Sequence, residues 1–404
     1  DEKIIIFTSG TTGKPKGVVL TWDNYETNAA TFRDIFSTCA AETMHLVMIN
    51  PLHHANSTAL ADWFLREPHS VIHLLPRYTT SYWEVLAGIA EENEGLLVAP
   101  CVSRHFDFLE ELDSEGKLPV ERKRLEKAMK KVSFLMGSSP VGPGTVERVI
   151  RWTGRPPIVR FGSTETCLQV LATPASFDAK MAMNSFCAGW KRSPSPGYYI
   201  GRPHAPHTET RIVRSVIPGE PGFMDTCSAG EDGYLIARGR NLMKGYLGDP
   251  ATTGEVFCQS WYLGFGDICF FLENVYDGEK DFYWLGRRSG LLIRGGANYS
   301  CEQVAAELSS FVSKKYGLNT GSFDLAVIGL RLESEHEDTC CVVIDDSRLD
   351  NTAQQIIRNT FLDEARSTVS KGARPERVDF GPIPRNFKGS LDTSELRKRW
   401  EEAR

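Results

Sequence analysis

The most informative stretch of the chain is Thr8-Ser9-Gly10-Thr11-Thr12-Gly13-Lys14-Pro15-Lys16-Gly17. Its three glycines let backbone N–H groups come close to a polyanion, and its four hydroxyl side chains can donate hydrogen bonds to phosphate oxygens. Its two lysines add positive charge, and the stretch contains no carboxylate. A simple surface turn has no need for so many donors, so this composition predicts a phosphate-binding loop.

Two strands are predicted on either side of this loop. The run Ile4-Ile5-Ile6-Phe7 precedes it, and Val18-Val19-Leu20 follows it. The loop differs from a Walker A loop because Pro15 stands where G-x-x-x-x-G-K-[ST] requires its second glycine. A Walker A loop also opens a helix, whereas a strand is predicted here, so the local arrangement is strand, loop, strand.

The following residues predict an α/β architecture. Asp23 and Glu26 have the spacing of a capping box, so we expect a helix that begins at Asp23 and runs to about Phe36. Across residues 45–165, apolar runs alternate with helical patterns, which favours a largely parallel sheet. The clearest runs are 45–49, 71–75 and 95–98 for strands and 82–90 and 145–152 for helices. From Gly201 onward, short strands at 211–214, 233–237 and 268–272 between Gly and Pro turns predict a β-rich subdomain.

A second, α+β unit is predicted to begin near Gly286. Its expected elements are strands at 291–293, 325–330 and 340–344 and helices at 301–316 and 351–370. Glycines at 286, 290, 295 and 296 supply the backbone freedom that a hinge needs. We therefore expect a large domain over residues 1–286 and a small, mobile carboxyl-terminal domain over residues 287–404.

The composition is that of an ordinary globular protein. Of the 404 residues, 41% are hydrophobic and 24% are charged, which excludes disordered, collagen-like and coiled-coil chains. The net charge is 46 − 52 = −6, so the chain lacks the basic surplus of a nucleic-acid binder. The one basic stretch, residues 121–131, contains two interspersed glutamates and has apolar Leu125 and Met129 at helical spacing, which predicts a solvated helix face.

The cysteine pattern and the lengths of the apolar runs predict the cellular compartment of the protein. The ten cysteines include no C-x-x-C pair, which predicts a reducing compartment and no zinc site. No run approaches the roughly 18 apolar residues of a membrane span, so a cytoplasmic location is expected. The chain opens at Asp1 without an initiator Met or a signal-peptide pattern, so we expect that it has been processed or is a fragment.

The phosphate loop and further motifs make the chain resemble the adenylate-forming (AMP-binding) superfamily, and most of all its acyl-CoA synthetases. The motifs stand in the family's order over about residues 1–390: Pro51-Leu52-His53-His54 (P-L-x-H), Gly137-Ser138-Ser139-Pro140 (G-G-A-P), Phe161-Gly162-Ser163-Thr164-Glu165 (Y-G-x-T-E), Gly201-Arg202-Pro203 (G-x-P), then Gly233-Tyr234-Leu235, Arg238-Gly239, Gly245-Tyr246, Gly266-Asp267, Gly286-Arg287 and Gly295-Gly296. The resemblance implies a large ATP- and acyl-binding domain with a small carboxyl-terminal lid.

The resemblance also implies roles for particular residues. The β- and γ-phosphates of ATP would contact Thr8, Ser9, Gly10, Thr11, Thr12, Gly13 and Lys16. Adenine would lie between two segments. One contains Gly137, Ser138 and Ser139, and the other contains Phe161, Gly162 and Ser163, with Phe161 stacked on the base. Thr164 would contact the α-phosphate, and Glu165 would hold Mg²⁺. Asp267 would bind the ribose hydroxyls, and Arg287 would lie near the ribose.

Several of these residues have a simpler interpretation when taken alone. Glu165 could be a surface carboxylate, Asp267 a turn residue after Gly266, and Arg287 one of a solvated pair. Their order relative to the loop favours the functional interpretation. His54, beside His53, is as compatible with a structural role as with contact to the acyl substrate.

The chain departs from the family's pattern in places that bear on activity. The portion that precedes the phosphate loop in the family is absent, so we expect exposed strand edges or another chain that covers them. The usual hinge Asp or Lys falls at Ser289-Gly290. In the segment Pro384-Arg385-Asn386-Phe387-Lys388-Gly389-Ser390, Ser390 stands where the family has its catalytic lysine, and Lys388 is the candidate substitute.

The predicted function is ATP-dependent activation of a small carboxylic acid as an acyl-adenylate, followed by thioester formation with coenzyme A. Thr8, Glu165 and Lys388 are the candidate catalytic residues, and ATP and Mg²⁺ the other expected ligands. Segments 53–61 and 161–170 show no evident charged anchor, so an apolar fatty or aryl acid is expected. One alternative is a stand-alone enzyme that loads a carrier protein. Another is a non-catalytic nucleotide-binding subunit, which Ser390 favours and the intact loop disfavours.

Overall fold

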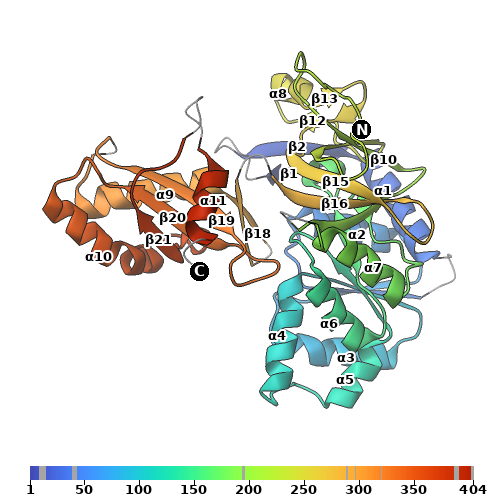
Figure 1. The fold of residues 1–404 in the computed structure, drawn as a ribbon. Coiled ribbons are helices and arrows are strands. Elements are labelled where there is room, and N and C mark those ends of the chain that lie inside the picture. The colour runs from blue at the N-terminus through green and yellow to red at the C-terminus, as the bar shows by residue number, and fades with distance from the viewer. Residues whose placement is uncertain are drawn as a thin grey trace. The chain divides into compact units, whose positions relative to one another are not determined.

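The computed structural model describes residues 1–8, 15–38, 43–192, 196–287, 290–295, 297–319, 321–385 and 391–401. The chain divides into two compact units, the first running through Gly286 and the second beginning at Arg287 (Figure 1). Among the described residues, no helix combines the length and the apolar character needed to cross a membrane.

The predicted strand–loop–strand arrangement is confirmed as an antiparallel hairpin. Strand β1 spans Glu2–Thr8 and β2 spans Lys16–Thr21, and a third strand, β12 (Gly245–Tyr246), pairs with the far side of β2. In this three-stranded sheet β1 lies at the edge. The side chain of Phe7 is 65% exposed, whereas Val18 and Leu20 are fully buried.

Helix α1 begins before the predicted position. It spans Trp22–Phe36, and its N-cap is Thr21, whose hydroxyl accepts a hydrogen bond from the backbone N–H of Asn24. The predicted capping box of Asp23 and Glu26 is therefore wrong: Asp23 pairs instead with Arg240 and Glu26 with Arg66. Thr21 and Asn24 have the same three-residue spacing, and they form the box because the β2 strand ends directly at Thr21.

The large sheet of the first unit has a parallel half. Its strands are β3 (Met44–Met48), β4 (Ser70–Leu74), β5 (Leu96–Cys101), β6 (Val132–Met136) and β7 (Ile158–Phe161). They lie in the order β4-β3-β5-β6-β7, and each neighbouring pair is parallel. This half confirms the predicted parallel sheet.

The sheet continues in antiparallel strands, so it is mixed rather than largely parallel. These strands are β8 (Leu171–Ala172), β9 (Tyr198–Pro203), β16 (Lys280–Arg287), β15 (Asp267–Glu273), β11 (Gly233–Gly239), β10 (Thr208–Val213), β14 (Trp261–Tyr262) and β13 (Phe257–Cys258). The reversal occurs between β7 and β8, where a tight turn replaces the long crossover that a parallel pair requires. The predicted β-rich subdomain thus extends the same sheet.

Helices cover both faces of the parallel half. One face packs against α1 and α2 (Ala55–Arg66), and the other against α3 (Tyr82–Glu92), α4 (Ser103–Ser114), α5 (Arg122–Met129), α6 (Pro143–Thr153) and α7 (Ala179–Trp190) (Figure 1). Side chains alternate between the faces along each strand: Ile158 packs on the α1–α2 side and Val159 on the other side. A short helix, α8 (Pro250–Glu255), follows β12.

The basic stretch at residues 121–131 forms α5, as predicted. Leu125, Ala128 and Met129 face the core, while Arg122 pairs with Glu126 on the surface at 2.9 Å. The stretch is therefore a solvated helix face.

The second unit has a core of its own. Its main sheet contains β19 (Asp324–Leu330), β20 (Thr339–Asp345) and β21 (Arg377–Phe380), and a separate hairpin joins β17 (Leu291–Arg294) to β18 (Ala297–Ser300). Helices α9 (Cys301–Tyr316) and α10 (Asn351–Thr368) contribute to one apolar cluster, and α11 (Thr393–Glu401) to another. The elements agree closely with those predicted from sequence.

Candidate functional site

The two ends of the predicted phosphate loop lie side by side. Thr8 ends β1, Lys16 begins β2, and the two residues are partners in the antiparallel ladder. The Thr8 hydroxyl is 3.5 Å from the Lys16 carbonyl oxygen, which accepts its hydrogen bond. The loop residues between them, Ser9, Gly10, Thr11, Thr12 and Gly13, lie outside the described residues. The hairpin therefore fixes where the loop leaves and re-enters the sheet.

Tyr246 connects this hairpin to Glu165. It pairs with Val18 across the β2–β12 ladder, and the Lys16 ammonium lies 5.0 Å from the centre of its ring. On the other side, the Tyr246 hydroxyl donates a hydrogen bond to Oε1 of Glu165 at 3.1 Å. Burial, together with the Glu165 charge, raises the pKa of Tyr246, so the phenol remains a donor. The structure thus brings together Lys16 and Glu165, two residues that the sequence predicted to act on the same ligand.

Glu165 sits on a tight turn that leaves no space for a side chain at Gly162. A Cβ atom at Gly162 would lie 2.3 Å from the carbonyl oxygen of Leu168 and 2.7 Å from Cα of Gln169. The turn contains a short 3₁₀ helix, Thr164–Thr166, and the Thr166 hydroxyl accepts a hydrogen bond from the backbone N–H of Ser163 at 2.9 Å. Close packing of the backbone on itself therefore sets the position of Thr164 and Glu165.

Distant asparagines support the same turn. The buried Asn241 amide donates to the carbonyl oxygens of Thr166 and Gln169, both at 2.9 Å. Asn28 on α1 donates to the carbonyl oxygen of Cys167. Sequence analysis did not identify these two asparagines or Tyr246 as site residues. Tyr246 belongs to the Gly245-Tyr246 motif, which could have identified it as a site residue. The two asparagines belong to none of the family's motifs named above.

Phe161 and Asp267 lie in the same part of the first unit. The ring centre of Phe161 is 6.3 Å from that of Phe265, two residues before Asp267. Asp267 is 2% exposed and begins β15, and its Oδ1 accepts a hydrogen bond from the Trp284 indole at 2.7 Å. The positive backbone angle φ of +68° belongs to Gly266, so Gly266 rather than Asp267 has the turn conformation.

The predicted adenine segment follows the carboxyl end of β6. Ser138 has a φ of +69°, an unusual conformation for a residue other than glycine. A Cβ atom at Gly137 would approach the carbonyl oxygen of Arg160 to 3.2 Å, so β6 and β7 run close together at this point. Gly137, Ser138 and Ser139 therefore lie at the same edge of the sheet as Phe161, where ligands of α/β proteins commonly bind.

His54 stands apart from the Tyr246 contacts. It is the N-cap residue of α2, and its ring packs on His53 with 4.3 Å between ring centres. Burial and the neighbouring His53 lower the pKa of His54, which favours the neutral ring.

Arg287 and Lys388 are the remaining predicted site residues. The backbone of Arg287 ends β16, and its side chain is not among those described. Lys388 lies outside the described residues, as does Ser390.

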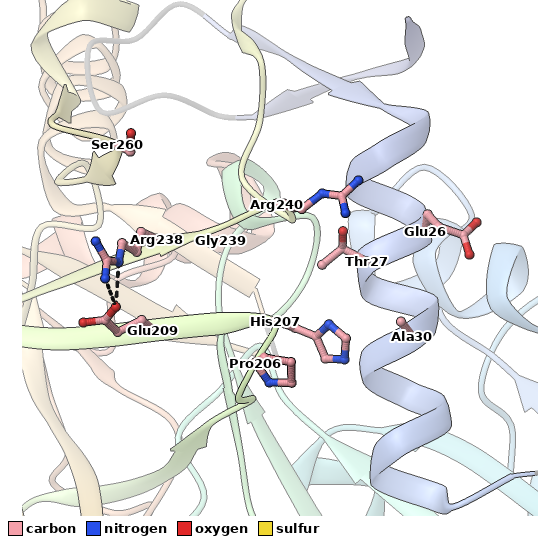
Figure 2. A pocket seen from close by; sticks show the side chains of 10 residues that line it. All are labelled: Glu26, Thr27, Ala30, Pro206, His207, Glu209, Arg238, Gly239, Arg240 and Ser260. Carbon is pink, nitrogen blue, oxygen red and sulfur yellow. Dashed lines mark hydrogen bonds and ion pairs between the residues drawn. The ribbon is translucent and has the colours of Figure 1, made fainter.

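A pocket of about 640 Å³ lies elsewhere in the first unit, between α1 and the β10–β11 segment (Figure 2). Its charged side chains have partners of opposite charge: Arg238 pairs with Glu209, and Nε of Arg240 lies 3.0 Å from Asp23. His207 forms a 2.8 Å contact with Asp34. Because these charges are already compensated, the pocket does not have the chemistry of the predicted ATP site.

The first unit is an α/β domain built on one large mixed sheet, as in the large domain of adenylate-forming proteins. Residues 1–247 match the family model described as AMP-binding enzyme, which is more than half of the chain. The chain belongs to this family.

Its relatives include CoA ligases of several organisms. The 2-succinylbenzoate–CoA ligase of Bacillus mycoides is 26% identical over 405 residues, and the match covers 98% of this chain and 70% of that protein. The malonate–CoA ligase of Arabidopsis thaliana is 24% identical, with 99% of this chain and 61% of that protein covered. These coverages give the length of the match and do not say which end of the relatives lies outside it. The absence of an amino-terminal portion therefore stays a prediction.

The fold of this chain is similar to that of a solved structure. The o-succinylbenzoate CoA synthetase of Bacillus subtilis, in a double mutant bound to a product analogue, has a TM-score of 0.68 and is 22% identical. The match covers 98% of this chain and 69% of that chain. At this identity the likeness concerns the fold alone.

Proposed function

We propose that this protein uses ATP to activate a small carboxylic acid as an acyl-adenylate and transfers the acyl group to the thiol of coenzyme A. The observation that carries the proposal is the contact series from Lys16 through Tyr246 to Glu165, at the base of the phosphate loop. In this proposal, Lys16 would be the cation for phosphate oxygens and Glu165 the carboxylate for a metal at one site. Membership of the AMP-binding family and the names of the related CoA ligases support the same reaction class.

The donor set fits ATP and Mg²⁺. Hard oxygen ligands suit Mg²⁺, and Glu165 supplies a carboxylate next to the position proposed for the phosphates. Bound there, the ion would neutralise charge on the phosphate oxygens. Thr8, Lys16 and the loop residues Ser9, Gly10, Thr11, Thr12 and Gly13 are proposed to donate to the β- and γ-phosphates.

The adenosine part of ATP is proposed to lie near Phe161 and Asp267. Phe161 would stack on adenine beside Gly137, Ser138 and Ser139, and Asp267 would accept hydrogen bonds from the ribose hydroxyls. The Trp284 indole supports this role because it orients the Asp267 carboxylate through one oxygen. Gly162 and Ser163 would place Thr164 at the α-phosphate, and Arg287 would lie near the ribose.

The proposed reaction has two steps. A carboxylate oxygen of the acid attacks the α-phosphorus of ATP, the bond to the bridging oxygen breaks, and pyrophosphate leaves. The thiolate of coenzyme A then attacks the acyl carbon, and AMP leaves with the electron pair of the broken C–O bond. Negative charge increases around the α-phosphorus in the first step, so donors positioned in advance accelerate it. Thr8, Glu165 and Lys388 are the proposed catalytic residues, and His54 the proposed acyl contact.

The second unit is proposed to act as the small lid domain that brings Lys388 to the α-phosphate. Its separate core and its boundary at Arg287 support this role. Rotation of such a unit would expose the acyl-adenylate to coenzyme A after the first step.

Ser390 favours one alternative, a non-catalytic nucleotide-binding subunit. Lys388→Ala and Ser390→Lys separate the two functions in an assay of pyrophosphate release. For the enzyme, we expect Lys388→Ala to slow acyl-adenylate formation about 10²- to 10³-fold, the usual effect of removing one such donor. Its effect on thioester formation from synthetic acyl-adenylate should be far smaller. ATP binding without pyrophosphate release in the wild type and both variants would identify the non-catalytic subunit.

A further inference from the structure

Arg160 is a buried arginine whose charge has no partner of opposite sign among the described residues. It is 6% exposed and lies on β7, one residue before Phe161. One nitrogen, Nη2, donates to Oδ1 of Asn56 at 2.9 Å, whereas Nε and Nη1 are buried without a hydrogen-bond partner in the described part of the chain. Buried charges are normally paired, so this arrangement requires an explanation.

The described residues around Arg160 do not supply a compensating negative charge. Burial lowers the pKa of Arg160 to about 10, and the one described group that opposes this shift is the thiol of Cys101, which burial keeps protonated. The nearby His204 is neutral at pH 7 because burial, His207 and Arg160 lower its pKa to about 4. Its Nε2 is also buried without a hydrogen-bond partner among the described residues. The guanidinium is therefore charged at neutral pH and faces neutral groups.

Arg160 points toward the amino-terminal end of α2. Asn56, its hydrogen-bond partner, lies in the first turn of this 12-residue helix. The N-cap residue His54 makes no side-chain cap, and the first turn contains no acidic residue. A helix amino terminus carries partial positive charge on its unpaired N–H groups. The guanidinium and the helix end thus form a positive site in which no carboxylate of the described residues takes part.

The position of Arg160 separates it from the proposed ATP site. Along β7, side chains alternate between the two faces of the sheet, so Arg160 lies with Ile158 on the α1–α2 side. Phe161, the proposed adenine contact, follows on the opposite side. Arg160 is therefore close in sequence to the reacting centre but directed away from the nucleotide.

We propose that Arg160, Asn56 and the amino-terminal end of α2 bind a second carboxylate of the acid substrate, so that this protein activates dicarboxylic acids. The inference deepens the proposed function and rests on it for the location of the carboxylate that reacts. A second carboxylate would accept hydrogen bonds from Nε and Nη1 of Arg160 and compensate the buried charge. This substrate class differs from the apolar acid expected from the sequence.

The test compares dicarboxylates with monocarboxylates of the same length, namely glutarate with pentanoate and adipate with hexanoate. We expect the wild type to release pyrophosphate preferentially with a dicarboxylate, and Arg160→Met to reduce this preference about 10- to 100-fold, the range for hydrogen bonds to a charged group. Arg151→Met is the matched control, because Arg151 lies on α6 with its side chain 64% exposed. It should leave the preference unchanged.

A second variant, Asn56→Asp, tests the charge argument without removing the arginine. The new carboxylate would lie against the guanidinium, so we expect a higher melting temperature together with loss of the dicarboxylate preference. If Arg160 had only a structural role, Arg160→Met would lower the melting temperature and reduce pyrophosphate release equally with both classes of acid. That pattern would overturn the inference, as would a wild type that prefers monocarboxylates.

Direct binding distinguishes failure of this inference from failure of the proposed function. In a thermal shift assay without ATP, the same dicarboxylates should raise the melting temperature of the wild type but not of Arg160→Met or Asn56→Asp. If no acid supports pyrophosphate release but the dicarboxylates still stabilise the wild type selectively, the proposed function fails and the anion site stands. If no dicarboxylate stabilises the wild type and release is equal for both classes of acid, the anion site is refuted.

Discussion

Replacing Gly162 with alanine tests how the turn at Thr164 and Glu165 is positioned. The added Cβ atom would lie 2.3 Å from the Leu168 carbonyl oxygen, 2.7 Å from Cα of Gln169 and 2.8 Å from the Thr166 hydroxyl. Two of these atoms belong to the backbone, so a side-chain rotation cannot relieve the contacts. The turn itself must move, and with it the carboxylate proposed to hold the metal.

The expected loss of stability follows from overpacking. Forcing a group into a well-packed site typically costs about 1–3 kcal/mol, which corresponds to a fall in melting temperature of about 2–12 °C for a unit of this size. Gly88→Ala is the matched control: Gly88 lies within α3, and a Cβ atom there would meet nothing within 4 Å. Alanine in a helix interior should stabilise the protein by about 0.5–1 kcal/mol.

Two measurements on both variants decide the outcome. Thermal unfolding gives the stability change, and pyrophosphate release gives the effect on the site. We expect Gly162→Ala to lower both, with a loss of activity that persists at temperatures where the variant is fully folded, and Gly88→Ala to lower neither. A Gly162→Ala variant that melts with the wild type and retains full activity would show that close packing at Gly162 does not position the turn.

Further predictions concern residues around the site and one buried histidine. Tyr246→Phe removes the hydrogen bond to Glu165, and calorimetry should show Mg²⁺–ATP binding weakened about 2- to 12-fold; unchanged affinity would remove Tyr246 from the site. Asn241→Ala leaves the two carbonyl oxygens it contacts without this donor, and urea unfolding should show a loss of about 1–3 kcal/mol; a loss below 0.5 kcal/mol contradicts the assignment. His105, whose pKa burial lowers from 6.5 to about 4, is neutral in the folded protein, whereas the unfolded chain takes up the proton below pH 6.5. The stability that His105 contributes should therefore be fully present above pH 6.5 and fall by up to about 3 kcal/mol between pH 6.5 and 4. His105→Gln should show a shallower fall over that window, and an identical profile would contradict the origin in His105.

Local patterns predicted the hairpin and the parallel strands well. A β-branched run before a Gly- and Thr-rich loop specifies strand and loop through neighbouring residues, as Ile4–Phe7 and Val18–Leu20 show. The mixed sheet was not predicted, because the reversal after β7 depends on contacts distant in sequence. Asn241 and Asn28 hold that turn across 72 or more residues of sequence.

The site was predicted in part, for a related reason. Motifs identified Lys16 and Glu165, but the hydrogen bond that links Tyr246 to Glu165 joins residues 81 apart. Arg160 is the clearest example of a residue whose environment the sequence does not reveal. In the sequence Ile158-Val159-Arg160-Phe161 it is one charged residue in a strand. Only tertiary packing makes it buried and leaves its guanidinium facing Asn56, so a sequence pattern indicates no charged anchor there.

Adenylation by this protein can be measured as acid-dependent pyrophosphate release by the purified chain, with the acyl-adenylate identified by mass spectrometry. Mono- and dicarboxylic acids should be supplied in parallel with Mg²⁺–ATP, and Glu165→Ala should serve as the control. We expect release that requires an acid, an adenylate of matching mass, and loss of both in Glu165→Ala. ATP binding with no acid-dependent release and no adenylate, or equal release by Glu165→Ala, would contradict the proposed function.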